Sequence, residues 1–254
     1  MVITASIAQS LTLQLLVSAL ILGFGVLARR VAPAPGGPVR TTAWFLAGVT
    51  FVAQGVVATL HSILAIVAVA AGPGTRFWNV YMRLMPAANE ARNMVVLGFA
   101  LALAWVVLLG RPSPRARAVV AAAVALMAAG TVIGLFEPPV QAQGGGEHFG
   151  IMSYFGAATA VLLFAVLYRA MVAESIDWLL WVALALYAVQ EALSSNIQMV
   201  LSWAGFGGNW RPPNQSMHWA GLVAAFVMFA CTLQRLAIAR RGAEPPGLLE
   251  RLRG

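Results

Sequence analysis

The residues of this chain that could do chemistry gather in one apolar stretch, Trp178 to Trp203. Read with the 3.6-residue period of a helix, one face of it carries Tyr187, Glu191, Ser194, Ser195, Gln198 and Ser202. A polar stripe in an apolar segment of membrane length must face other helices or a water-filled cavity, because lipid cannot satisfy it. We therefore expect Glu191 to lie inside a bundle, paired with Arg83 or Arg92, hydrated, or protonated.

Polar residues in other apolar segments fall at a similar depth. Measured from the predicted inner ends of their segments, they map to the outer half of the bilayer, whereas the inner half is almost entirely Ala, Leu and Val. Ser153 belongs to this set. The sequence thus predicts an outward-facing polar pocket, and its candidate ligand-binding residues are His61, Glu90, Arg92, Asn93, Glu191, Ser195, Asn196, Gln198 and His218.

The composition indicates a polytopic, all-α membrane protein. Of the 254 residues, 61% are hydrophobic and 9% are charged, and the mean hydropathy is +0.83. The net charge is +8, and all 16 basic residues are Arg. These arginines lie in short clusters between apolar segments and in the tail. Such clusters favour anionic lipid headgroups as the partner and do not favour nucleic acid.

Seven apolar segments are long enough to be membrane spans. They cover residues 9–28, 43–70, 77–109, 118–136, 151–171, 177–203 and 217–238. Arginines concentrate after the first, third, fifth and seventh segments, which predicts a seven-helix bundle with its N-terminus outside and its C-terminus inside. We expect one transmembrane domain over 1–241 and a short cytoplasmic tail over 242–254. The membrane is the cell membrane, and the inner membrane if the source is bacterial.

The start of the sixth segment carries Asp177, the only Asp of the chain. We interpret it as an N-cap or first-turn residue and assign it no chemistry.

Metal and haem chemistry have few candidate ligands here. His61 and His218 at similar depth could be axial haem ligands. A zinc site would need these two with Glu90 or Glu191, and no local motif such as HExxH supports it. The sequence therefore predicts no metal site and identifies no cofactor. The single cysteine, Cys231, excludes a disulfide within the chain.

Seven spans, an outside N-terminus and Arg92 early in the third span resemble the plan of the microbial rhodopsins. That resemblance implies retinal bound as a Schiff base to a Lys in the seventh span. The chain has no Lys, so a retinal Schiff base is excluded and only the architecture could be shared.

Two short motifs resemble those of the rhomboid intramembrane proteases. They are Gly150-Ile151-Met152-Ser153 and His218-Trp219-Ala220-Gly221. The resemblance implies Ser153 as nucleophile and His218 as its base. Tyr154 stands where that family has Gly, and the earlier spans carry no companion motif, which puts the nucleophile in doubt.

The leading interpretation is a protein that binds a small molecule, lipid or pigment, as a sensor-like module or a subunit of a membrane complex, and it does not favour an enzyme. A sensor would need a separate signalling partner. The alternatives are a small transporter or channel in which Glu191 is protonated, an intramembrane serine hydrolase using Ser153 and His218, and a structural subunit whose polar stripe docks another membrane helix.

Overall fold

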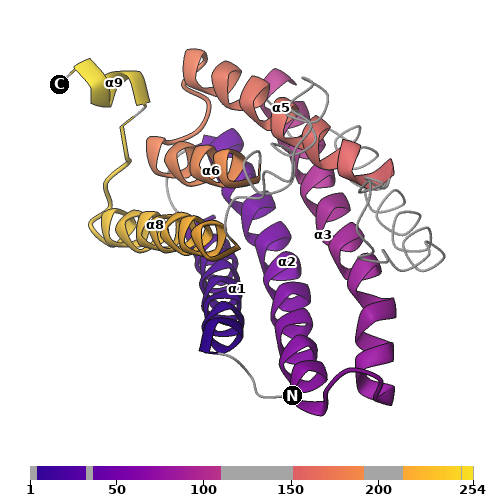
Figure 1. Cartoon of the computed structure of the whole chain (residues 1–254). Helices are drawn as coiled ribbons and strands as arrows, with labels where there is room; N and C mark the ends of the chain where they lie inside the picture. Colours follow the sequence, from indigo (N-terminus) through magenta and orange to yellow (C-terminus); the bar gives the residue numbers. More distant parts are fainter. Residues whose placement is uncertain (1–4, 33–36, 110–150, 192–213, 247, 254) are drawn as a thin grey trace.

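The structure, a computed structural model, describes residues 5–32, 37–109, 151–191, 214–246 and 248–253. All regular secondary structure in these ranges is helical, without strands (Figure 1). The helices are α1 (Ala5–Val31), α2 (Gly37–Ala71), α3 (Arg76–Leu109), α5 (Ile151–Val172), α6 (Trp178–Glu191), α8 (Asn214–Arg240) and the short α9 (Leu248–Arg253).

Three segments of these helices are long and apolar enough to cross a membrane. They are Gln9–Val31 in α1, Gly37–Ala71 in α2 and Trp219–Arg240 in α8. Shorter apolar segments are Met94–Leu109, Thr159–Val172 and Trp178–Gln190. Large apolar side chains are exposed along the outer sides of the helices, among them Leu60, Ile63, Val161, Val223 and Phe226. Lipid satisfies such surfaces and water does not, so the described helices are consistent with a helical membrane protein.

The six long helices form a closed ring. Each packs against the next in the order α1, α2, α3, α5, α6 and α8, and α8 returns to α1. Figure 1 shows α6 and α8 lying across the lengths of α1 and α2. The inward side chains of all six helices form one hydrophobic core. Any polar side chain in this core must find its partners within the bundle.

Aromatic side chains fill the centre of the ring. Phe51 of α2 makes edge contacts with Phe24 at 5.0 Å, Tyr187 at 4.9 Å and Phe99 at 5.8 Å between ring centroids. These four rings, from α1, α2, α3 and α6, are called the aromatic layer below. All four are buried, so the layer closes the centre of the described bundle at this depth.

Glycines set the close approach of α1 and α2. A Cβ atom added to Gly25 would lie 2.4 Å from the backbone nitrogen of Val52, and one added to Gly55 would lie 2.6 Å from Cα of Leu22. Real Cβ atoms do not come so near to backbone, so these positions require Gly. Small residues at helix contacts let backbones approach in membranes, where dispersion contacts hold helices together.

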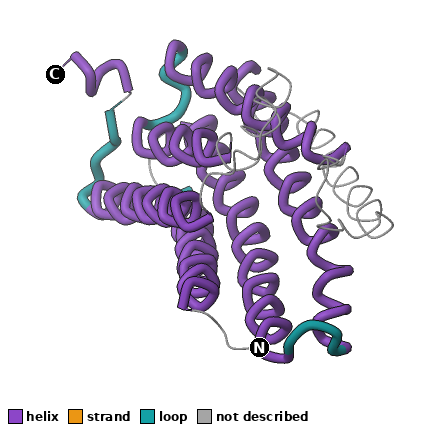
Figure 2. Tube along the Cα trace, in the orientation of Figure 1, coloured by secondary structure: helices purple, strands orange, loops and turns teal. Residues whose placement is uncertain are grey.

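The two ends of the bundle differ in charge. The last turns of α1, α5 and α8, the first turn of α2 and helix α9 carry arginines: Arg29, Arg30, Arg40, Arg169, Arg240, Arg241, Arg251 and Arg253. We call this the arginine-rich end. At the opposite end, Gly72 and Gly74 form the α2–α3 turn with positive φ, drawn as a teal loop in Figure 2. Thr75 caps α3 there through a 3.3 Å bond from the Trp78 amide.

The all-helical character expected from the composition is confirmed over the described residues, and the three candidate membrane spans are consistent with the expected membrane protein. The third segment is one helix, and its apolar part covers Met94–Leu109. The predicted fourth span and the second half of the sixth fall outside the described residues. The count of seven spans and the orientation therefore stay predictions.

Candidate functional site

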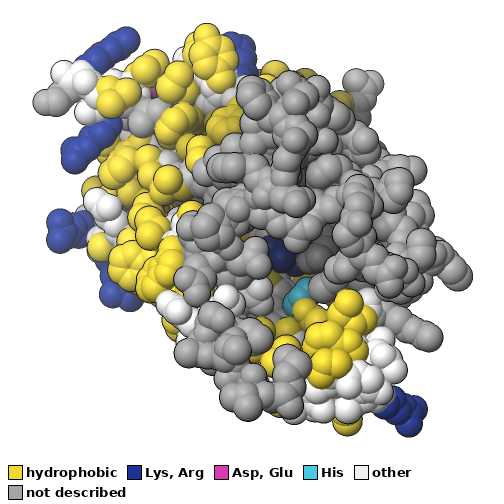
Figure 3. All heavy atoms as spheres, in the orientation of Figure 1, with side chains coloured by type: hydrophobic (Ala, Val, Ile, Leu, Met, Phe, Trp, Pro, Cys, Tyr) yellow, Lys and Arg dark blue, Asp and Glu magenta, His cyan; other side chains and the backbone are white. Residues whose placement is uncertain are grey.

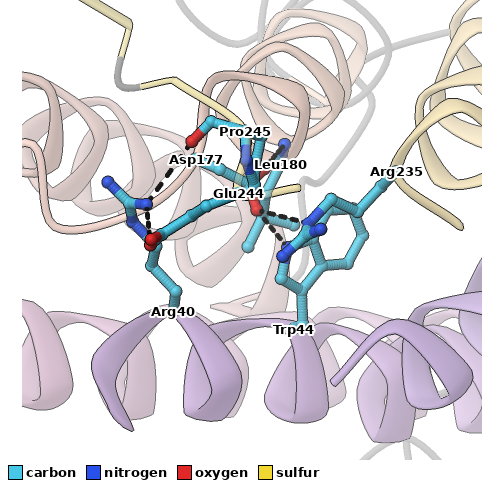
Figure 4. A network of polar contacts seen from close by, with 7 residues as sticks. All are labelled: Arg40, Trp44, Asp177, Leu180, Arg235, Glu244 and Pro245. Atoms are coloured by element: carbon cyan, nitrogen blue, oxygen red, sulfur yellow. Dashed lines mark hydrogen bonds and ion pairs between the residues drawn. The ribbon is translucent and has the colours of Figure 1, made fainter. Parts of the chain in front are cut away.

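The most completely connected polar group in the described core is the carboxylate of Asp177. Its Oδ2 accepts a hydrogen bond from Trp44 Nε1 at 2.6 Å and from Arg235 Nε at 3.3 Å (Figure 4). Its Oδ1 accepts from the Leu180 amide at 3.0 Å. The exposed fractions of Trp44, Asp177 and Arg235 are 1%, 0% and 1%. We call these three residues the Asp177 cluster, which joins α2, α6 and α8.

The position of Asp177 follows from helix capping. It precedes the first residue of α6, and its backbone carbonyl accepts the first helical bond from the Trp181 amide. The bond to Leu180 satisfies one of the amides that have no partner in the first turn of a helix. A negative charge is also favoured at this end of the helix dipole. The predicted N-cap role is confirmed.

The Asp177 cluster corrects one expectation. The inner half, at the arginine-rich end, was expected to consist almost entirely of Ala, Leu and Val. Instead it holds a buried ion pair, because Arg235 extends inward from α8 to reach Asp177. A buried charge is tolerated where another charge and hydrogen bonds satisfy it, and this cluster supplies both.

Outside the Asp177 cluster, exposed contacts link the tail to the same end. Arg40 at the start of α2 forms a 2.6 Å ion pair with Glu244, whose side chain is 55% exposed (Figure 4). The guanidinium of Arg251 in α9 lies 5.6 Å from the centre of the Trp178 ring. Both contacts are at the surface, where ion pairs and cation–π contacts contribute little stability.

A second buried polar pair lies deeper in the bundle. Gln54 of α2 donates from Nε2 to the hydroxyl of Tyr187 on α6 at 2.6 Å. Gln54 is 2% exposed, and its Oε1 has no hydrogen-bond partner in the described part of the chain. A buried carbonyl oxygen without a partner is costly, so this oxygen is a candidate acceptor for a bound group.

A third polar group lies nearer the opposite end. Nε2 of His61 on α2 lies 3.3 Å from the hydroxyl of Tyr81 on α3, with the two rings edge to face at 5.6 Å. Arg92 of α3 is close enough for its charge to act on His61. Its Nε is buried and, among the described residues, has no hydrogen-bond partner. We call His61, Tyr81 and Arg92 the outer polar group.

In Figure 3 a cyan His side chain lies near a dark blue Arg side chain on the face that is drawn. His61 is the one histidine whose side chain the structure describes.

The three polar groups lie at different positions along the length of α2. Gln54 lies about 15 Å along the helix from Trp44, and His61 lies about 10 Å beyond Gln54, at 1.5 Å per residue. Phe51, the centre of the aromatic layer, lies about 10 Å along α2 from Trp44 and about 5 Å from Gln54, and Tyr187 of the same layer bonds Gln54. Buried polar atoms without a hydrogen-bond partner among the described residues occur at both levels: Ser175 Oγ lies two residues before Asp177 in the chain, whereas Gln54 Oε1 and Arg92 Nε belong to the other two polar groups.

The predicted ligand-binding residues are described to different extents. The side chains of His61 and Arg92 are described, and the positive charge of Arg92 acts electrostatically on His61. Glu90, Asn93, Glu191 and His218 lie on helices, but their side chains are outside the description, as is that of Ser153. Ser195, Asn196 and Gln198 lie outside the described residues altogether. The expected convergence of all nine stays a prediction.

The structure describes the side chains of only some of the candidate metal and haem ligands. In the described ranges, no three His, Cys, Asp or Glu side chains gather in a way that could hold a metal ion. The haem and zinc hypotheses both need His218, and the hydrolase hypothesis needs Ser153 and His218, whose side chains the structure does not describe. These hypotheses are left untested.

Sequence reasoning missed the Asp177 cluster. It placed Asp177 at the start of the sixth segment but assigned it no partner from the seventh segment, which contains Arg235. A signal was present, because Arg235 lies one turn inside the apolar segment, where an unpaired cation would be costly. It also named Tyr187 in the polar stripe of the sixth segment, but periodicity within one helix cannot show that Tyr187 bonds to Gln54.

Comparison with known proteins gives no match. No protein-family model, curated protein or solved structure matches this chain.

Proposed function

We propose that this chain is a seven-helix membrane protein, with its arginine-rich end in the cytoplasm, that binds a small molecule, lipid or pigment in a blind polar pocket. The pocket opens at the end opposite the arginines. Its described part consists of the Gln54–Tyr187 pair as its floor and the outer polar group as its wall. The bound molecule makes the protein a sensor-like module or a subunit of a membrane complex.

One observation carries this proposal: two buried polar atoms of opposite kind, on neighbouring helices, have no hydrogen-bond partner in the described chain. Gln54 Oε1 is an acceptor and Arg92 Nε is a donor. They belong to neighbouring helices, α2 and α3. A ligand with a donor at one pole and an acceptor or anionic group at the other would satisfy both.

Helix α6 supports the same pocket. Tyr187 faces the core, and position 191 follows it by one helical turn on the side toward the opposite end. This register supports the assignment of Glu191 to the pocket wall.

The aromatic layer favours binding over transport. Below Gln54 and Tyr187, the rings of Phe51, Phe24 and Phe99 fill the centre of the described bundle. A carrier or channel must open such a layer, whereas a binding pocket can end on it. Uptake into vesicles that is abolished by Glu191→Gln would overturn the blind pocket and favour the carrier.

The proposal is tested by identifying what is bound to the purified protein. We expect an absorption spectrum to reveal haem, carotenoid or chlorophyll, and mass spectrometry of an organic extract to reveal a colourless ligand. His61→Phe and Arg92→Gln should deplete that species. Thr59→Val is the matched control, because Thr59 lies on α2 between Gln54 and His61 and bonds only its own helix, at 2.7 Å to Gly55.

Three outcomes are informative. A species enriched with the wild type and Thr59→Val, and depleted in the other two variants, supports the pocket. Identical extracts from all four proteins contradict it. Equal depletion in Thr59→Val also contradicts it, since that result would reflect general loss of fold.

A further inference from the structure

The arginine-rich end carries an exposed cationic surface that the proposed function does not use. At the edge formed by α5, α8 and α9, the exposed arginines are Arg169, Arg240, Arg241, Arg251 and Arg253. The described acidic residues nearby are fewer, and Glu244 is already paired with Arg40. In Figure 3 dark blue side chains project from the upper left edge, where α8 and α9 lie in Figure 1.

The tail after α8 is folded back toward the other helices of this end. The Arg40–Glu244 ion pair ties the segment after α8 to α2. Helix α9 then contacts α5 and α6, and the guanidinium of Arg251 lies over Trp178. The tail therefore holds α9 beside the ends of the membrane helices.

Apolar and aromatic side chains accompany these charges. Leu252 of α9 is 72% exposed and Tyr168 of α5 is 66% exposed. Tyr and Trp favour the headgroup level of a bilayer, and a short helix with Leu and Arg side chains suits the boundary between headgroups and acyl chains. A surface in water would gain nothing by exposing Leu252, whereas a lipid surface buries it.

We propose that α9 and the end of α5 form a binding site for the phosphate headgroups of anionic phospholipids. Arg169, Arg251 and Arg253 supply the cations, and Leu252 and Tyr168 insert at the headgroup boundary. Arginine is suited to this role because its planar fork donates two hydrogen bonds to a phosphate. The site lies at the end of the bundle remote from the proposed pocket and does not depend on it.

The test uses the full chain in detergent with added phosphatidylglycerol or phosphatidylcholine. Native mass spectrometry measures how much of each lipid stays bound. We expect the wild type to retain phosphatidylglycerol preferentially. Arg251→Gln/Arg253→Gln should weaken that retention on the order of tenfold, because each arginine near an anionic surface strengthens binding severalfold.

The matched control is Arg29→Gln/Arg30→Gln. These two arginines are exposed at the same end, in the last turn of α1, and their removal lowers the net charge equally. Preferential retention that survives in this control and is lost in the α9 variant supports a site at α9. If both variants lost the preferential retention of phosphatidylglycerol equally, the effect would come from net charge alone. That result would overturn the site at α9.

A second measurement guards against misfolding. Hydrogen exchange of residues 248–253 should slow when phosphatidylglycerol is added and should not respond to phosphatidylcholine or inorganic phosphate. The proposal would be overturned if inorganic phosphate alone slowed the hydrogen exchange of residues 248–253. It would also be overturned if the wild type retained both lipids equally.

Discussion

The Oδ2 atom of Asp177 and the Nε atom of Arg235 lie 3.3 Å apart, although 58 residues separate them in the sequence, and both side chains are buried. This ion pair joins the start of α6 to the last turns of α8, and Trp44 extends it to α2. Three helices of the ring are thus held at one depth by a single carboxylate. The removal of either charge should therefore affect the whole bundle.

We expect Asp177→Asn to lower the free energy of unfolding by about 3–5 kcal/mol, because the positive charge of Arg235 stays buried without its counter-ion. The double variant Asp177→Asn/Arg235→Gln should recover part of this loss. Thermal unfolding of the purified protein in detergent measures both. The control is Glu244→Gln, which breaks an exposed pair with Arg40 and should cost less than about 1 kcal/mol. If Asp177→Asn and Glu244→Gln lowered the free energy of unfolding equally, burial of the Asp177–Arg235 pair would not account for its contribution.

Trp44→Phe should destabilise the protein more than Trp181→Phe. Trp44 donates to a buried carboxylate at 2.6 Å, and a bond to a charged group contributes about 1.5–3 kcal/mol. Trp181 donates to the backbone carbonyl of Leu167 at 2.9 Å, a neutral bond that contributes about 0.5–1.5 kcal/mol. The same unfolding measurement ranks the two variants. The opposite order would show that Asp177 is satisfied without Trp44.

Gly25→Ala and Gly55→Ala should both destabilise the bundle, because the new methyl groups would meet the backbone of the facing helix at 2.4 Å and 2.6 Å. Gly221→Ala is the control, since its nearest neighbour would be 3.8 Å away. An alanine stabilises an unobstructed helical position by about 0.5–1 kcal/mol, so the sign of the change should reverse. Unfolding temperatures that fall equally in all three variants would contradict the close packing of α1 on α2.

Tyr187→Phe should cost about 1–3 kcal/mol, because it leaves both polar atoms of the buried Gln54 amide without a partner in the described bundle. Gln54→Leu/Tyr187→Phe should be more stable than Tyr187→Phe alone, since the double variant removes the unsatisfied amide. A double-mutant cycle on unfolding free energies measures this coupling. Strictly additive effects would mean that the Gln54–Tyr187 bond makes no contribution.

The membrane class, the helices and the N-cap role of Asp177 could be predicted from the sequence. Each depends on local information: apolar runs of membrane length, their ends at Arg, Gly and Pro, and an Asp directly before a helix. The same local reading placed His61 and Arg92 at a common depth, because distance along a helix follows from residue count. It also excluded a retinal Schiff base, since that chemistry needs a Lys.

Only the tertiary structure decided which polar residues meet across the ring. Periodicity gives the face of one helix, but the order of helices around a ring and their rotation depend on packing between distant segments. That packing places Arg235 against Asp177 and Gln54 against Tyr187, and it brings the ring of Phe51 onto the ring of Tyr187. Sequence reasoning expected the half at the arginine-rich end to be uniformly apolar. It contains a buried charge pair instead, because the packing of distant helices brings Asp177 and Arg235 together there.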